Sequence, residues 1–170
     1  MPPSRGRKRM KKVLYIDMDG VLNLFEHDPD ARTNMWKDGY FHDISPRENI
    51  ESDLIMLSGY FDEIVILTKC IARDGVKAEK REFVGMYLSH VDRLSMVFVP
   101  YGRSKADYID PGCFTVLLDD GLKNIMECEG KCDVAVLFQE NRDYEYKNMV
   151  HEVGGVIRFL PQWMMHPETA

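Results

Sequence analysis

The sequence lacks any long apolar run, and it is poor in cysteine. None of its hydrophobic segments approaches the roughly 20 residues that a membrane-spanning helix requires. The few cysteines show no disulfide framework, and their spacing fits no zinc knuckle. They are Cys70, Cys113, Cys128 and Cys132. We therefore expect a cytoplasmic protein with reduced thiols and no membrane contact.

We expect no secretory signal, because the basic segment 1–12 is not followed by the apolar region that such a signal contains. We interpret this segment as a disordered tail, with Met10 as an alternative start, in preference to a nucleic-acid contact. Without its six basic residues the net charge falls from −6 to −12. The negative charge of the remaining chain argues against a broad surface that binds nucleic acid. Residues 13–170 are enough for one domain with a substantial core.

The most informative segment is 13–22, Val-Leu-Tyr-Ile-Asp-Met-Asp-Gly-Val-Leu. Its four leading apolar residues predict a strand that is buried on both faces, as in a parallel sheet. Because side chains in a strand repeat every two residues, Asp17 and Asp19 leave its end on the same side. Gly20 then permits a tight turn or a close approach to a ligand. Two carboxylates so close together indicate a functional site.

A calcium loop is the main structural alternative for these aspartates. An EF-hand loop that starts at Asp17 needs Asp or Asn at its fifth position and Gly at its sixth. The sequence has Val21 and Leu22 there. A solvated turn is also disfavoured, because apolar residues flank the motif on both sides.

The remaining pattern alternates strands with helices. Residues 25–43 are polar, aromatic and poorly periodic, and we interpret about 23–44 as a short cap insertion above the sheet. Ser45, Pro46 and Glu48 resemble a capping box that opens a helix ending near Gly59. A second helix is predicted over 76–90 and a weaker one over about 145–153. Further strands are predicted at 63–68, 95–99, 115–118, 134–138 and 156–160. This order predicts an α/β fold, a three-layer, doubly wound parallel sheet.

Polar side chains follow several of these strands, where ligands gather in such sheets. Thr68 ends the second strand, and Asp119 and Asp120 end the fourth. Arg103 and Lys105 follow the third strand. Carboxylate oxygens suit Mg²⁺, and a hydroxyl and a lysine suit the oxygens of a phosphate group.

The order Asp-x-Asp, Thr, Lys, Asp-Asp resembles the haloacid-dehalogenase (HAD) superfamily of phosphotransferases. Residues 17–22 fit its first motif, 66–68 the second, Lys105 the third and 117–120 the fourth. The resemblance implies a HAD-like Rossmannoid fold and a Mg²⁺-dependent phosphomonoester hydrolase that acts through an aspartyl-phosphate.

The resemblance also implies a role for each motif residue. Asp17 would be the nucleophile, and Asp19 the general acid and then the base. Thr68 and Lys105 would bind the phosphate. The Mg²⁺ ligands would be carboxylates of Asp17, Asp119 and Asp120 and the backbone carbonyl of Asp19.

A narrower resemblance is to the 5′(3′)-deoxyribonucleotidase group, in segments 17–26, 39–46 and 103–105. Aromatic side chains hold the base in that group, and Phe25 and Phe41 stand at matching positions. Trp36 is a candidate by its place in the insertion, and Arg103 by its place in the third motif.

We therefore expect a phosphatase that acts on nucleotide 5′- or 3′-monophosphates as small-molecule substrates. Three alternatives remain open: a phosphatase of a sugar phosphate or a polynucleotide phosphate end, a catalytically silent HAD-like binding module, and a phosphoacceptor receiver domain. The receiver is disfavoured because the third strand ends at Val99 and Pro100 without an acid.

Overall fold

The computed structural model describes residues 9–139 and 149–151. Its centre is a six-stranded sheet in the order β3-β2-β1-β4-β5-β6, in which every neighbouring pair is parallel. The strands are β1 (Lys12–Ile16), β2 (Glu63–Cys70), β3 (Leu94–Pro100), β4 (Phe114–Asp119), β5 (Val134–Gln139) and β6 (Met149–His151). The chain therefore has the α/β parallel-sheet fold that the sequence predicts.

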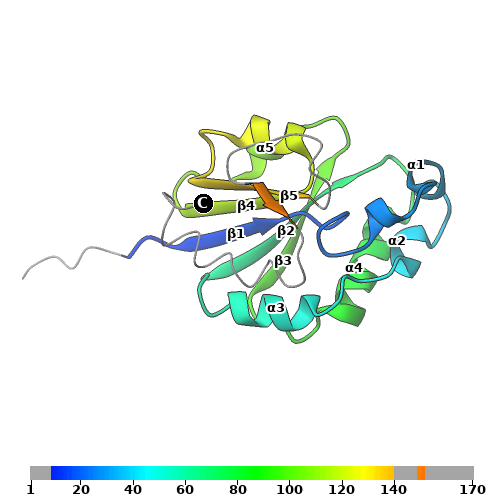
Figure 1. Cartoon of the computed structure of the whole chain (residues 1–170), viewed down its shortest axis with the longest axis horizontal. Coiled ribbons are helices and arrows are strands. Elements are labelled where there is room, and N and C mark those ends of the chain that lie inside the picture. Colours follow the sequence, from blue (N-terminus) through cyan, green and yellow to red (C-terminus); the bar gives the residue numbers. More distant parts are fainter. Residues whose placement is uncertain (1–8, 140–148, 152–170) are drawn as a thin grey trace, which may run out of the picture.

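Helices cover both faces of the sheet (Figure 1). On one face lie α3 (Ile50–Leu57) and α4 (Val76–Tyr87), and on the other α5 (Leu122–Cys128) and the short 3-10 helix η2 (Lys105–Tyr108). The alternation of side chains along β1 explains the two cores. Leu14 and Ile16 pack with residues of α3 and α4, whereas Val13 and Tyr15 pack with residues of η2 and α5. Apolar residues on both faces thus require a helical layer on each side.

The insertion, residues 23–44, lies beyond the carboxyl ends of the strands (Figure 1). Its backbone is fastened to α4 by Glu79, whose carboxylate accepts hydrogen bonds from the amides of Gly39 (2.9 Å) and Phe41 (3.2 Å). The guanidinium of Arg73 donates two further hydrogen bonds of 2.7 Å to the same carboxylate. The insertion contains the 3-10 helix η1 (Phe25–His27) and the helices α1 (Ala31–Asn34) and α2 (Tyr40–Asp43).

The predicted capping box at 45–48 is wrong, because α3 begins only at Ile50. Pro46 instead forms an isolated antiparallel bridge with Asn23. On either side of this bridge, the amide of Leu24 donates to the carbonyl of Ser45, and the amide of Arg47 donates to that of Leu22. This pairing satisfies the backbone groups of 45–47 in an extended conformation, and so the tertiary contact overrides the local helix signal.

Two further predictions fail near the C-terminal part of the sheet. The helix predicted over about 145–153 is wrong at 149–151, which pair with β5 as strand β6. The edge of β5 offers unpaired backbone groups there, which explains why an extended segment is favoured. The predicted strand 156–160 lies outside the described residues. Sequence reasoning also missed α5, which has seven residues and is too short for a clear helical period.

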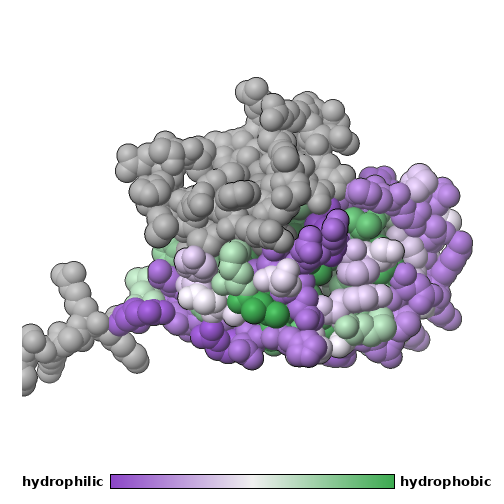
Figure 2. Space-filling model, turned by 60° about the horizontal axis from the view of Figure 1, so that its bottom comes forward, coloured by the Kyte–Doolittle hydropathy of each residue, from purple (hydrophilic) through white to green (hydrophobic). Residues whose placement is uncertain are grey.

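Within the residues that the structure describes, no helix has the length and apolar character needed to cross a membrane. The face drawn in Figure 2 is mainly hydrophilic, and hydrophobic residues appear on it as small patches among polar ones.

Candidate active site

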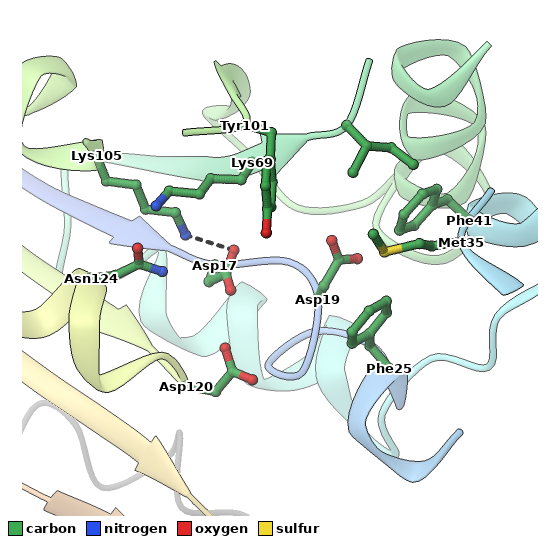
Figure 3. Close-up of a pocket in the computed structure, with 11 residues that line it drawn as sticks. Asp17, Asp19, Phe25, Met35, Phe41, Lys69, Tyr101, Lys105, Asp120 and Asn124 are labelled. Atoms are coloured by element: carbon green, nitrogen blue, oxygen red, sulfur yellow. Dashed lines mark hydrogen bonds and ion pairs between the residues drawn. The ribbon is translucent and has the colours of Figure 1, made fainter. Parts of the chain in front are cut away.

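A pocket of about 190 Å³ opens at the carboxyl ends of the strands (Figure 3). This volume is below the usual 300–1,000 Å³ of a site that encloses a whole ligand, so it suits a small group such as a phosphate. The lining residues come from the strand ends, the insertion and α5. They are Asp17, Asp19, Phe25, Met35, Phe41, Lys69, Ile71, Tyr101, Lys105, Asp120 and Asn124.

A buried lysine joins two aspartates at the base of the pocket. The Nζ atom of Lys105 lies 2.7 Å from Oδ1 of Asp17 and 2.5 Å from Oδ2 of Asp119. The other oxygen of Asp119 accepts hydrogen bonds from the amide of Gly121 and the side chain of Asn124. Lys105 begins η2, so the turn after β3 carries its ammonium between the ends of β1 and β4.

Three carboxylates form a candidate metal centre beside this lysine. Single oxygens of Asp17, Asp119 and Asp120 all lie within 4.8 Å of one another. Gly20 makes this approach possible: its φ is +83°, and a Cβ atom there would lie 2.1 Å from a carboxylate oxygen of Asp120. Hard oxygen donors in this number fit Mg²⁺, which is commonly held by one or two carboxylates together with phosphate oxygens and water.

The charges of the cluster are incompletely balanced. Burial raises the pKa of Asp17 to about 6, and the neighbouring Asp119 contributes, although Lys105 opposes the rise. Burial and the charges of Asp17 and Asp119 also raise the pKa of Asp120 well above its ordinary value. Burial by itself would lower the pKa of Lys105, but the carboxylates of Asp17 and Asp119 outweigh it and raise that pKa. Lys105 contacts two of these three carboxylates, so the cluster retains excess negative charge that a divalent cation would offset.

Asp19 points into the pocket from the loop after β1, next to Phe25 and Met35 (Figure 3). Oδ1 of its carboxylate accepts a 3.0 Å hydrogen bond from the side-chain amide of Asn23, and Oδ2 forms an ion pair with Lys80. Asn23 is fully buried, and its own side-chain oxygen accepts the amide of Gly20, which fixes the turn of the loop.

Thr68 is fully buried and does not line the pocket. Its hydroxyl oxygen accepts a 2.7 Å hydrogen bond from Nζ of Lys80. Thr68 is thus near Asp19 through a shared lysine, and its predicted role in phosphate binding stays a prediction.

The four candidate substrate-binding residues fall into two groups. Phe25 and Phe41 line the pocket, and their rings stack with an interplanar angle of 2° and centroids 6.5 Å apart. Phe41 is almost fully buried, in a cluster with Ile71 and Val76, so it also anchors the insertion to the sheet. Trp36 and Arg103 are exposed and do not line the pocket.

Sequence reasoning missed several residues of the site, above all Lys80. Its signal was present, because Val76, Glu79, Lys80 and Phe83 follow the i, i+3, i+4, i+7 spacing of one helix face. Two charged residues on an otherwise apolar stripe indicate buried partners. Tyr101 was also missed. It follows β3, is 73% exposed and lines the pocket (Figure 3).

No protein-family model matches the sequence, and no curated protein is significantly similar to it. Solved structures are similar in fold. A D,D-heptose 1.7-bisphosphate phosphatase from B. bronchiseptica, complexed with magnesium and phosphate, has a TM-score of 0.64 at 16% identity, covering 89% of this chain and 98% of the other. The corresponding enzyme from Burkholderia thailandensis has a TM-score of 0.60 at 13% identity, covering 91% and 99%. A chain of the Pnkp1/Rnl/Hen1 RNA repair complex has a TM-score of 0.52 at 17% identity, covering 75% and 42%.

At such identities the likeness concerns the fold. It confirms the α/β fold class, and the resemblance to the HAD superfamily stays a prediction. The resemblance to the deoxyribonucleotidase group stays a prediction.

Proposed function

We propose that this protein is a Mg²⁺-dependent phosphomonoester hydrolase that acts through an aspartyl-phosphate on Asp17. The observation that carries the proposal is the position of the Asp17 carboxylate. It lines the pocket, contacts Lys105 at 2.7 Å and lies among the oxygens of Asp119 and Asp120. The fold shared with magnesium- and phosphate-bound heptose bisphosphate phosphatase supports the same chemistry.

In the first step, an oxygen of Asp17 attacks the phosphorus of the substrate while the bond to the leaving oxygen breaks. Asp19 donates a proton to that leaving oxygen. In the second step, Asp19 takes a proton from water, and the resulting hydroxide attacks the aspartyl-phosphate and releases inorganic phosphate. Lys105 and Thr68 are the proposed phosphate-binding residues.

Asp17, Asp119, Asp120 and the backbone carbonyl of Asp19 are the proposed Mg²⁺ ligands. When bound, the ion would reduce the repulsion between the anionic nucleophile and the anionic phosphate. The clustering of three carboxylates, two of which contact Lys105, is the structural support for this assignment.

Nucleotide 5′- or 3′-monophosphates are the proposed substrates. The pocket is small, so the group attached to the phosphate must extend to the rim. There Phe25 and Tyr101 offer aromatic faces, and stacking of a base on such a face contributes about 1–3 kcal/mol. A sugar phosphate is the second candidate, favoured by the shared fold with the heptose bisphosphate phosphatases.

A phosphate-release screen tests this function. Nucleotides, sugar phosphates and oligonucleotides with 5′- or 3′-phosphate ends are compared, each with Mg²⁺ and with EDTA. We expect hydrolysis with Mg²⁺, loss of hydrolysis with EDTA, and the highest kcat/KM for a mononucleotide. Preference for a sugar phosphate or an oligonucleotide end would change the substrate assignment, and full activity in EDTA would contradict the metal role. If no substrate is hydrolysed, the catalytically silent HAD-like binding module becomes the better interpretation.

A further inference from the structure

Lys80 is a lysine whose whole side chain is buried in the fold. It extends from α4, its side chain is 0% exposed, and it does not line the pocket. A buried ammonium needs several polar partners, because burial without them costs several kcal/mol. Those partners therefore indicate what the lysine does.

The partners of Lys80 belong to the candidate site. Its Nζ atom forms an ion pair with Oδ2 of Asp19, donates a 2.7 Å hydrogen bond to the hydroxyl of Thr68 and contacts the backbone carbonyl of Lys69 at 3.1 Å. The ammonium also lies 4.5 Å from the centre of the Phe41 ring. Together these contacts restrict the position of Nζ before any substrate enters.

Both oxygens of Asp19 are consequently held. Asn23 donates to Oδ1, and Lys80 forms an ion pair with Oδ2. The carboxylate retains a side-chain exposure of 19%, and this exposed part lines the pocket. A carboxyl group that first donates a proton and, as the carboxylate, then accepts one at a fixed place benefits from such restriction.

From this geometry we propose that Lys80 is a positioning residue: it holds the Asp19 carboxylate turned into the pocket and does not itself touch the substrate. This inference rests on the proposed role of Asp19 in phosphomonoester hydrolysis. It adds a residue from α4, outside the four motif segments, to the machinery of the site.

The test is a double-mutant cycle between Asp19→Asn and Lys80→Met, measured by the hydrolysis of phenyl phosphate. Lys80→Met keeps the length of the side chain and removes the ammonium. We expect it to lower kcat by about 10- to 100-fold with little change in KM. In the Asp19→Asn background the same substitution should lower kcat by less than threefold, because the group that it positions is already disabled.

A merely structural lysine gives a different result, namely the same fold-loss in both backgrounds, and that outcome would overturn the proposal. Lys77→Met is the matched control, since Lys77 is an exposed lysine on the same helix. It should leave kcat and KM unchanged. Lys80→Gln, which keeps a hydrogen-bond donor, replaces Lys80→Met if the latter does not fold. Failure of both variants to fold would assign Lys80 to stability and overturn the proposal.

A second measurement separates this inference from the proposed function. Crystal structures of the wild type and of Lys80→Met show where the Asp19 carboxylate points, whether or not any substrate is hydrolysed. We expect it to turn away from the pocket in the variant. If the wild type is active and the Asp19 carboxylate has the same orientation in Lys80→Met, the role of Lys80 alone is overturned. An inactive wild type would overturn the proposed function.

Discussion

Lys105 and Asp17 are 88 positions apart in the sequence, yet Nζ of the lysine lies 2.7 Å from the carboxylate, and both are buried. Lys105 also contacts Asp119, so it partly neutralises two buried acids at once. Removing one partner of a buried ion pair costs more than the pair contributes, because the remaining charge stays desolvated.

Lys105→Met should therefore lower the free energy of unfolding by about 3–5 kcal/mol in metal-free buffer. Urea denaturation of the variant and the wild type measures this difference. Lys123→Met is the control, because Lys123 is 84% exposed on α5 and its pair with Glu127 is a surface one. Equal free energies of unfolding for the two variants would show that Lys105 does not stabilise the fold through Asp17 and Asp119.

The two aspartates of the first motif should respond differently to substitution. Asp17→Asn removes the nucleophile and should abolish transfer of the phosphoryl group to the protein. Asp19→Asn keeps the nucleophile but loses acid–base catalysis, which is worth about 10²–10⁴-fold. Nitrophenyl phosphate should be partly spared in Asp19→Asn, because its leaving group needs little protonation. Steady-state kinetics with nitrophenyl and phenyl phosphate measure the difference. Near-normal activity of both variants would contradict the scheme.

Acid should weaken the attachment of the insertion to α4. Hydrogen bonds from Arg73, above all, lower the pKa of Glu79 from 4.5 to about 2. A carboxyl group with a lowered pKa contributes stability that is complete above the unfolded value and disappears as the pH falls through the folded one. The window here is pH 4.5 to about 2.

Wild-type protein should therefore lose about 3 kcal/mol more stability across this window than Glu79→Gln, which has no carboxyl group to protonate. Denaturant unfolding at several pH values provides the measurement. Glu82→Gln, at an exposed position of the same helix, should keep the wild-type pH dependence. If the free energy of unfolding falls equally with pH in Glu79→Gln and in the wild type, the Glu79–Arg73 pair is not the cause of the loss of stability in acid.

Alanine substitutions of Phe41 and Phe25 should distinguish a residue that anchors the insertion from one that binds the base of a nucleotide. Phe41 is almost fully buried, so Phe41→Ala should lower the free energy of unfolding by about 3–5 kcal/mol and affect all substrates alike. Phe25→Ala should raise KM for nucleotides about tenfold and leave that for small aryl phosphates unchanged. Trp36 lies outside the pocket lining, so Trp36→Ala serves as the control. Parallel changes in KM for nucleotides and aryl phosphates in Phe25→Ala would remove the support for a nucleotide substrate.

Much of the fold and of the acidic cluster could be predicted from local sequence. Apolar segments such as 13–16 and 115–118 become buried strands because a parallel sheet covered by helices on both faces buries the side chains that point to either side. Parallel strands bring their carboxyl ends to one edge, so the acids that follow two of them meet there. The predicted proximity of Asp17, Asp119 and Lys105 follows from that single geometric fact.

Other features depended on contacts between distant segments. Residues 45–47 pair with the chain around Asn23 and delay the start of α3, although the local signal favours a helix. The helical spacing in α4 indicates that Lys80 is buried, but it does not indicate which groups Lys80 contacts. Only the packing of α4 against the end of β2 and the loop after β1 places its ammonium between Thr68 and Asp19. Which chemical groups end the strands could be predicted from the sequence, because that depends on neighbouring residues. Which buried charges face one another followed from the folded structure, because ion pairing depends on distance in space and not along the chain.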